Sequence, residues 1–461
     1  MKVMIKGDHF VDEEGNQLLF NGINTVCKDP EHGYLFPDME PVFKRFREQG
    51  FNLIRLGIFW DGVEPQPGVY DQAYLGRVKD MVELAWRYGL YTMLDMHQDL
   101  YSRKWSDGAP LWATLDEGLP HPDNCTMWYE AYLQSEAVIR AADNFWKNAP
   151  AEDGIGLLDH YEAMWEMLAA YFDSCESIIG YEPMNEPFMG GLARAAFGEA
   201  AAQTAARFAD YDPTNPLTMT AEQSAFYMGI VSEKLMGFDR DTLMPFYRRM
   251  QRAVERVSAK PLITGGNIYS SSTIPTGITR LDERGNQIYA PHGYDAVVDS
   301  DNYDSFNKGN VEALFADKRR SQLALDLPTI VGEWGAFPSK SFTNDLIRHM
   351  NGILEQYLWS SAYWLWQPGL ENDPNYSELS RAYPMVTAGE LHSYHYAADQ
   401  KSLSLRYAAR ENGMTTVYCP FLPKAIEGTL DANVRVEPLS ASACLVHIRA
   451  SKSEEIDLML S

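Results

Sequence analysis

Cysteine is scarce in this sequence of 461 residues, which contains only Cys27, Cys125, Cys175, Cys419 and Cys444. None of the five forms a CxxC pair, so their spacing indicates neither a zinc site nor a disulfide framework. We therefore expect reduced thiols, no bound metal and no cofactor.

Basic residues are in the minority as well. The chain has 39 Lys and Arg against 64 Asp and Glu, which gives a formal net charge of −25 at pH 7. Such a charge is repelled by the phosphates of nucleic acids and by anionic lipid headgroups. We therefore expect a neutral substrate, no nucleic-acid partner and no electrostatic attachment to membranes.

Long apolar runs are missing too. No stretch approaches the roughly 20 apolar residues that a membrane-spanning helix needs, so stable membrane insertion is not expected. The first residues, MKVMIKGDHFVDEEG, reach charge and glycine before any apolar run of signal-peptide length. We expect a cytoplasmic protein, or a secreted one if a leader preceded this chain, and the sequence predicts no particular oligomeric state.

What the chain does contain is a regular alternation of short β-branched runs with segments of helical period, which is typical of βα units and a parallel sheet. The candidate strands are residues 18–24, 51–59, 90–96, 177–185, 261–265, 288–292, 328–334 and 361–366. Eight such units predict a (β/α)8 TIM barrel, and we expect residues 1–380 to contain this barrel together with an N-terminal β-hairpin. Apolar residues alternate with polar ones after about residue 392, so we expect residues 381–461 to form a small antiparallel β-sandwich.

Two connections are too long to be simple turns: residues 98 to about 127, after the third strand, and residues 188 to about 239, after the fourth. Both follow the carboxyl ends of strands, the face on which barrel enzymes build their active sites, so we expect both to wall a cleft. The second contains an apolar-aromatic cluster between Phe226 and Phe238, in what we expect to be a loop. Ordinary packing is the favoured interpretation of this cluster, and a greasy substrate wall is the alternative.

The strongest local motif is YEPMNEP, residues 181–187, at the end of the fourth candidate strand. Pro187 cannot continue a strand ladder, so pairing stops where Glu186 must turn toward the cleft. Asn185 adds an amide that suits a sugar hydroxyl. The run IVGEWG, residues 330–335, delivers a second carboxylate, Glu333, to the end of the seventh strand.

Two glutamates on the fourth and seventh strands face each other across the barrel mouth. Retaining glycosidases need two carboxyl groups about 5 to 5.5 Å apart, and this placement allows that separation. An ionised Glu333 would raise the pKa of its neighbour, so we expect Glu186 to act as the acid/base and Glu333 as the nucleophile. This chemistry needs no metal.

Other polar and aromatic residues fall at the same ends of the remaining strands. They are Arg55, His97, Asp99, His292, Tyr294, Trp364 and Trp366. We expect Arg55 to orient the nucleophile, Tyr294 to hydrogen-bond Glu333, and a tryptophan to lie beneath the sugar ring. Taken singly, each of these residues could have a structural role, as an ion pair, a loop cap or a hydrogen-bonded core histidine. Their placement at the same ends of the strands favours an active site.

This set of residues, with Asn185-Glu186-Pro187 and Glu333, resembles glycoside hydrolase family 5, the cellulase-like retaining group, over about residues 15–370. The run DMHQDLYS at residues 95–102, followed by Gly108-Ala109-Pro110 and Trp112, is similar to the endoglycoceramidase and glucosylceramidase branch. The resemblance implies double-displacement hydrolysis of the β-glycosidic bond between a sugar headgroup and a hydrophobic aglycone such as ceramide or a sterol.

Carried over by position, the resemblance implies roles for the individual residues. Glu186 matches the acid/base, Glu333 the nucleophile and Asn185 the contact to the 2-hydroxyl; His97, Asp99 and Lys28 match headgroup contacts, and Trp366 is expected to be the platform, with Trp364 close by. Two alternatives stay open. One is a β-glucosidase or endo-β-glucanase acting on soluble aryl glucosides or oligosaccharides, and the other is a carbohydrate-binding protein that has lost turnover.

Overall fold

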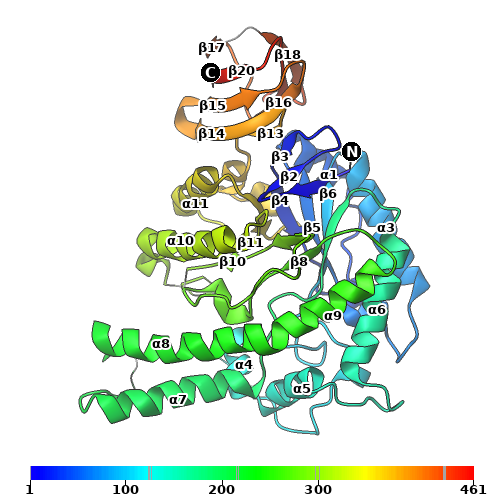
Figure 1. Ribbon diagram of the computed structural model, residues 1–461, viewed down its shortest axis with the longest axis vertical. Helices are drawn as coiled ribbons and strands as arrows, with labels where there is room; N and C mark the ends of the chain where they lie inside the picture. Colours follow the sequence, from blue (N-terminus) through cyan, green and yellow to red (C-terminus); the bar gives the residue numbers. More distant parts are fainter. Residues whose placement is uncertain are drawn as a thin grey trace.

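A closed parallel barrel forms the centre of the computed structural model, which describes residues 2–122, 125, 127–213, 215, 218–295, 297, 298, 300, 302–428 and 432–461 (Figure 1). Its strands are β4 (Asn21–Thr25), β5 (Leu53–Ile58), β6 (Tyr91–Met96), β7 (Ile178–Glu182), β8 (Leu262–Thr264), β9 (Gln287–Tyr289), β10 (His292–Gly293), β11 (Ile330–Gly335) and β12 (Ser360–Trp364). Neighbours along the sheet follow the order β10-β11-β12-β4-β5-β6-β7-β8-β9. Since β9 and β10 are two parts of the sixth strand, and Tyr289 bridges to Thr329 just before β11, the sheet closes on itself. The predicted (β/α)8 fold is confirmed.

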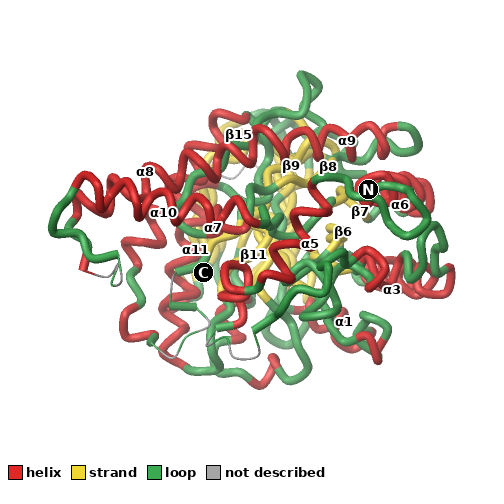
Figure 2. The backbone as a smooth tube through the Cα atoms, turned by 90° about the horizontal axis from the view of Figure 1, so that it is seen from below, coloured by secondary structure: helices red, strands yellow, loops and turns green. Residues whose placement is uncertain are grey.

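Helices surround the barrel, as Figure 2 shows with the strands at the centre. They are α1 (Glu40–Glu48), α2 (Trp60–Val63), α3 (Gln72–Arg87), α4 (Ala131–Gln134), α5 (Glu136–Trp146), α6 (Leu157–Phe172), α9 (Met244–Glu255), α10 (Lys308–Leu325) and α11 (Asn344–Tyr357). Helix α3 illustrates the local rules. Asp71 caps its start by accepting hydrogen bonds from the backbone amides of Ala73 and Tyr74, and Gly89 follows its end with a φ of 73°.

The long connection after β7 is helical. Helix α7 (Gly191–Arg207) and helix α8 (Ala221–Phe238) run beside each other and reach outward from the barrel (Figure 1). Thr220 and Gln223 form a capping box that begins α8, which explains why a helix forms where we expected a loop. The apolar cluster lies on this helix, with Leu235 and Phe238 buried in the core, so the packing interpretation fits the structure.

The C-terminal region is a pair of antiparallel sheets, as predicted. Its strands are β13 (Tyr383–Thr387), β14 (Gly389–Ala397), β15 (Ser402–Ala409), β16 (Met414–Cys419), β17 (Ile426–Gly428), β18 (Ala432–Pro438), β19 (Cys444–Ala450) and β20 (Glu454–Leu460). One sheet has the order β14-β15-β20-β17, and the other continues from β13-β16-β19-β18 into strands from the beginning of the chain. Buried residues of both sheets form their own core, which includes Leu403, Val417 and Ile456.

The N-terminal strands are β1 (Met4–Lys6), β2 (His9–Val11) and β3 (Gln17–Leu18). Strand β1 pairs antiparallel with β2, and β2 with β3, so the expected N-terminal hairpin is present. Strand β3 pairs with β13, so these strands extend the C-terminal sheet. Phe10 and Phe20 also pack against barrel residues such as Leu53, which places apolar side chains under the barrel floor. The first segment of the chain therefore joins the two cores.

No helix in the described part of the chain is both long enough and apolar enough to cross a membrane.

Candidate active site

Glu186 and Glu333 meet at the carboxyl ends of the barrel strands. Glu333 lies within β11, and Glu186 follows the end of β7 with a φ of 38°, an uncommon backbone conformation for a residue other than glycine. An oxygen of each carboxylate lies within 4.8 Å of the other and of a His292 ring nitrogen. This separation fits the retaining arrangement and is shorter than the roughly 6.5–9.5 Å of inverting glycosidases.

Glu333 is held from two sides. The guanidinium of Arg55 donates a 2.7 Å hydrogen bond to one carboxylate oxygen, and the hydroxyl of Tyr294 donates a 2.8 Å bond to the other. Burial and the charge of Glu333 raise the pKa of Tyr294, so its hydroxyl stays protonated and remains a donor. Both oxygens of the expected nucleophile therefore have a fixed direction.

Arg55 is the hub beneath the site. It is fully buried on β5 and contacts Glu182 at 2.7 Å and Asp95 at 3.1 Å, in addition to Glu333. It also donates to the side-chain oxygens of Asn185 at 2.8 Å and Asn24 at 3.0 Å. Although burial alone would lower the pKa of Arg55, the surrounding carboxylates raise it, so the group is a permanent cation.

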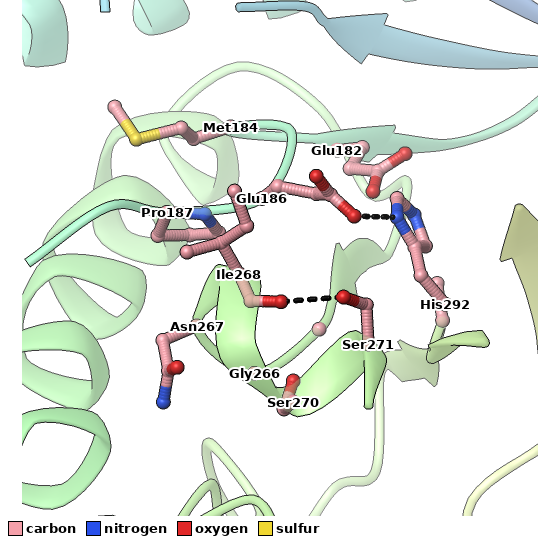
Figure 3. A pocket seen from close by; sticks show the side chains of 12 residues that line it. Glu182, Met184, Glu186, Pro187, Gly266, Asn267, Ile268, Ser270, Ser271 and His292 are labelled. Carbon is pink, nitrogen blue, oxygen red and sulfur yellow. Dashed lines mark hydrogen bonds and ion pairs between the residues drawn. The ribbon is translucent and has the colours of Figure 1, made fainter. Parts of the chain in front are cut away.

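Glu186 has a different environment. Its carboxylate contacts Nδ1 of His292 at 2.9 Å (Figure 3). The same nitrogen lies 3.5 Å from Glu333. Burial raises the pKa of Glu186 most, and the charges of Glu333 and Asp99 add to the shift, whereas the His292 contact opposes it. The direction agrees with the expectation from the sequence, but the largest cause is burial and not the charge of Glu333.

A polar group lies beside the two glutamates. Lys28 forms an ion pair with Asp99, and Nε2 of His97 lies 3.8 Å from the same carboxylate. Asp95 contacts Nδ1 of His97 at 2.8 Å. Burial alone would lower the pKa of His97, but the Asp95 charge and the hydrogen bonds to Asp95 and Asp99 together raise it to about 10. Burial alone would raise the pKa of Asp99, but its contacts with Lys28 and His97 together lower it to about 2. Charged hydrogen-bonding groups thus face the pocket.

The expected platform, Trp366, is not in the pocket. Only 6% of it is exposed, and it packs edge-on against Phe36 and Phe46 in the core. Trp364 lines the pocket instead, stacked on His97 at 5.4 Å with Lys28 5.2 Å above its ring. The sequence allowed either tryptophan to lie in the pocket, because both are close to the end of the eighth strand. The course of the backbone after β12 decides which one faces the pocket.

Asn185 lies at the edge of the pocket with its amide largely occupied. Its oxygen accepts from Arg55, and its nitrogen donates a 3.2 Å bond to the carbonyl of Gln98. These bonds fix the orientation of the amide. Its contact to a sugar hydroxyl stays a prediction.

The pocket has a volume of about 570 Å³ and a partly aromatic wall. Besides the predicted site residues, it is lined by Trp128, Tyr129, Glu130, Tyr132, Leu133, Ile268, Tyr269, Ser271, Ser272, Asp295, Val298 and Ala336. Within the described part of the chain, the connection of residues 188–239 contributes no lining residue, so our expectation that it walls the cleft is wrong. The connection after β6 contributes Asp99, and its residues 123, 124 and 126 lie outside the described residues.

Sequence reasoning missed several residues of this site. Asp95 and Glu182 complete the surroundings of Arg55, and Trp128, Tyr129 and Tyr132 build the wall. A charged residue inside a buried strand was the available signal for Asp95, which precedes His97 by two positions and so shares its face. The aromatic residues follow a long connection, and nothing in their spacing indicates a wall.

Two groups of side chains in the described part of the chain have metal-ligand atoms close together: His97, Asp99 and Asp107, and Glu186, His292 and Glu333. In each group a side-chain cation already contacts a carboxylate, Lys28 in the first and Arg55 in the second. A metal ion would have to displace or neighbour that positive charge, so neither group is a favourable metal site.

Comparisons with known proteins agree with this geometry. The family model described as "Cellulase (glycosyl hydrolase family 5)" matches residues 11–369. An endoglycoceramidase of Cyanea nozakii is 35% identical over 212 residues, which cover 40% of this chain and 41% of that protein. Endoglycoceramidase I of Rhodococcus hoagii (strain 103S) is 25% identical over 427 residues, which cover 88% of this chain and 76% of that protein.

A solved structure is also similar. The structure of endo-glycoceramidase II from Rhodococcus sp. in complex with a five-membered iminocyclitol superposes with a TM-score of 0.77 at 25% identity, covering 98% of both chains. Barrel and C-terminal sheets are therefore shared over nearly the whole length. The similarity to the Cyanea relative is confined to less than half of either protein.

Proposed function

Because the chain belongs to glycosyl hydrolase family 5, we propose that it is a retaining β-glycosidase that releases a sugar headgroup from a hydrophobic aglycone such as ceramide or a sterol. The observation that carries this proposal is the pair of carboxylates, Glu186 and Glu333, within 4.8 Å of each other, one of them held by Arg55 and Tyr294. The names of the relatives support a glycolipid as the substrate.

The reaction would proceed in two displacements. Glu333 attacks the anomeric carbon while Glu186 donates its proton to the departing glycosidic oxygen, so the aglycone leaves as an alcohol and a glycosyl ester forms. Glu186, now ionised, takes a proton from water, and the resulting hydroxide displaces Glu333 from the sugar. The raised pKa of Glu186 suits the first step, because the acid must be protonated when substrate binds.

The lining of the pocket supports an amphiphilic substrate. Lys28, His97, Asp99 and Trp364 contact one another and suit a sugar, since they combine charged hydrogen-bonding groups with an aromatic ring. Trp128 contacts Tyr129 and Tyr132 ring to ring and forms a separate aromatic group in the same pocket. A hydrophobic aglycone would lie against this second group.

The test is product release by the purified protein from glucosylceramide, a steryl glucoside, a lactosyl lipid and a short β-glucan, with Glu333→Gln as the control. Cleavage of a lipid glycoside by the wild-type protein alone would support the proposal and identify the sugar. Cleavage of the glucan alone would keep the mechanism and favour the soluble-glycoside alternative. Binding without turnover would favour the non-catalytic alternative.

A cytoplasmic location also stays a prediction, which cell fractionation would test.

A further inference from the structure

Lys318 is a buried cation that the proposed mechanism does not use. It lies on α10, is 1% exposed, and forms no ion pair with any residue that the structure describes. Lysine is seldom buried without a paired carboxylate, because removing its charge from water is unfavourable. Burial accordingly lowers the pKa of Lys318 to about 8. Such a residue calls for an explanation other than stability.

The bonds of Lys318 converge on one loop. Its ammonium donates to the backbone carbonyl oxygens of Ser270 and Ser272, at 3.1 Å for Ser272. Both belong to the η6 loop, which we define as residues 267–277 and which contains the short 3-10 helix η6 (Ile268–Ser271). Four residues of this loop line the pocket: Ile268, Tyr269, Ser271 and Ser272.

A second buried charge holds the two ends of the same loop. Asp239, 0% exposed, begins the π-helix η5 (Asp239–Leu243) between α8 and α9. Its carboxylate accepts from the backbone and side-chain amides of Asn267 at 3.2 and 2.8 Å, and from Thr276 and Gly277 at 2.9 and 2.8 Å. Asp239 thus closes the base of the η6 loop, and Lys318 fixes its middle.

The η6 loop touches both catalytic segments. The amide of Ile268 donates a 3.1 Å bond to the carbonyl of Pro187, next to Glu186, and the amide of Tyr294 donates a 3.1 Å bond to the carbonyl of Ser271. Figure 3 shows the loop directly across from Glu186. Since the hydroxyl of Tyr294 also donates to Glu333, a short chain of bonds connects Lys318 to the nucleophile.

We propose that Lys318 is a positioning residue for the glycosidase reaction: by holding the carbonyls on either side of Ser271, it sets the place of Tyr294 and thereby the direction of the Glu333 carboxylate. The inference rests on the proposed function. Displacing a catalytic group by about 1 Å through a distant change can lower the rate on the order of 100-fold. A single buried lysine can therefore matter without touching substrate.

The experiment compares Lys318→Met with Lys260→Met, on the glycoside that the wild-type protein cleaves. Lys260 is a matched control, because its ammonium also donates to a backbone carbonyl, that of Cys175 at 2.9 Å, but remote from the η6 loop. We expect Lys318→Met to lower kcat roughly 10- to 100-fold with a smaller change in KM. We expect the control to keep the wild-type kcat.

Two further readouts separate positioning from a merely structural role. Lys318→Met also removes the donor of the Ser270 and Ser272 carbonyls, so its thermal midpoint should fall, and kcat is therefore compared at a temperature well below that midpoint. In a Tyr294→Phe background, Lys318→Met should lower kcat little further, because the path through Tyr294 is already broken. Lys318→Gln keeps one donor group and should lose less activity than Lys318→Met.

The outcomes are distinct. If Lys318→Met matches the Lys260→Met control, or if its loss multiplies fully with that of Tyr294→Phe, the positioning role is overturned while the glycosidase function stands. If Lys318→Met does not fold, Lys318→Gln takes its place in the comparison with Tyr294→Phe, and the same two results decide for or against the role. A wild-type protein that cleaves no glycoside would overturn both proposals.

Discussion

The two glutamates of the pocket carry the same functional group, yet their surroundings differ. Glu333 receives a hydrogen bond on each oxygen, from a guanidinium that is always charged and from the Tyr294 hydroxyl. The carboxylate of Glu186 contacts the ring of His292, and its pKa is set mainly by burial. The surroundings of Glu333 fix the orientation of its carboxylate, and the surroundings of Glu186 allow its carboxylate to be protonated and deprotonated. In the proposed mechanism, these different surroundings suit Glu333 to the role of nucleophile and Glu186 to that of acid/base.

The largest expected effect comes from removing the fixed carboxylate. Glu333→Gln should lower kcat on every substrate on the order of 10⁴-fold or more, because an amide cannot form the glycosyl ester. Steady-state rates on a lipid glycoside and on an aryl glycoside would measure this loss. The control is Glu312→Gln, at a glutamate whose side chain is 62% exposed. A Glu333→Gln variant as active as that control would reverse the assignment.

The second-largest effect is expected from replacing Arg55, the cation that contacts Glu333. In Arg55→Met, the carboxylates of Asp95, Glu182 and Glu333 lose their shared partner, so we expect the free energy of unfolding to fall by about 3–5 kcal/mol and turnover to fall with it. Denaturant unfolding and kcat are the measurements. The control is Arg320→Met, because the Arg320 side chain is 71% exposed. It should change the free energy of unfolding and kcat little. Equal stability of the two variants would contradict the hub role of Arg55.

Glu186→Gln tests whether Glu186 donates the proton to the leaving group. We expect a loss of about 10²- to 10⁴-fold on lipid glycosides, whose alcohols leave only when protonated, and a much smaller loss in the glycosylation step of activated aryl glycosides. Pre-steady-state rates on a series of leaving groups would show this as a steeper dependence on leaving-group pKa. A uniform loss across the series would remove Glu186 from the acid role.

The smallest effect concerns the position of a pH profile. Because the His292 contact lowers the pKa of Glu186, His292→Leu should raise that pKa. Glu186 must be protonated for the first step, so activity falls as the pH rises through its pKa, and the alkaline limb of kcat/KM should move to higher pH. The comparison variant is Tyr294→Phe, which lacks the contact to Glu333 and should leave this limb in place. A shift to lower pH in His292→Leu would refute the argument.

The barrel and the two glutamates could be predicted because their signals are local. Each strand is a short buried run, and the carboxyl ends of parallel strands must meet at one face, so Arg55, His97, Glu186, His292 and Glu333 converge without any knowledge of long-range contacts. The sequence does not predict which side chain of a bend faces the pocket. Trp364 and Trp366 are both compatible with the end of one strand, and only the local backbone decides that Trp366 turns into the core.

Partners that lie far apart in the sequence could not be predicted. The η6 loop, its anchors Asp239 and Lys318, and the aromatic wall at Trp128 come from different connections, whose course depends on packing of the whole chain. The helical form of residues 221–238 was predictable in principle, because Thr220 and Gln223 form a capping box whose pattern is visible in the sequence.

The pairing of β3 with β13 has a consequence for biosynthesis. Leu18 is made early and its partner Val386 late, so the sheet that covers the barrel floor is completed only after the whole barrel sequence has been synthesised. Until then the edge of β3 and the apolar side chains of Phe10 and Leu18 lack part of their cover, which exposes a surface prone to self-association. A chain whose synthesis stops before β13 would keep this apolar surface exposed. The surface is covered only when β13 has been synthesised and pairs with β3, so the nascent chain is prone to aggregation until then.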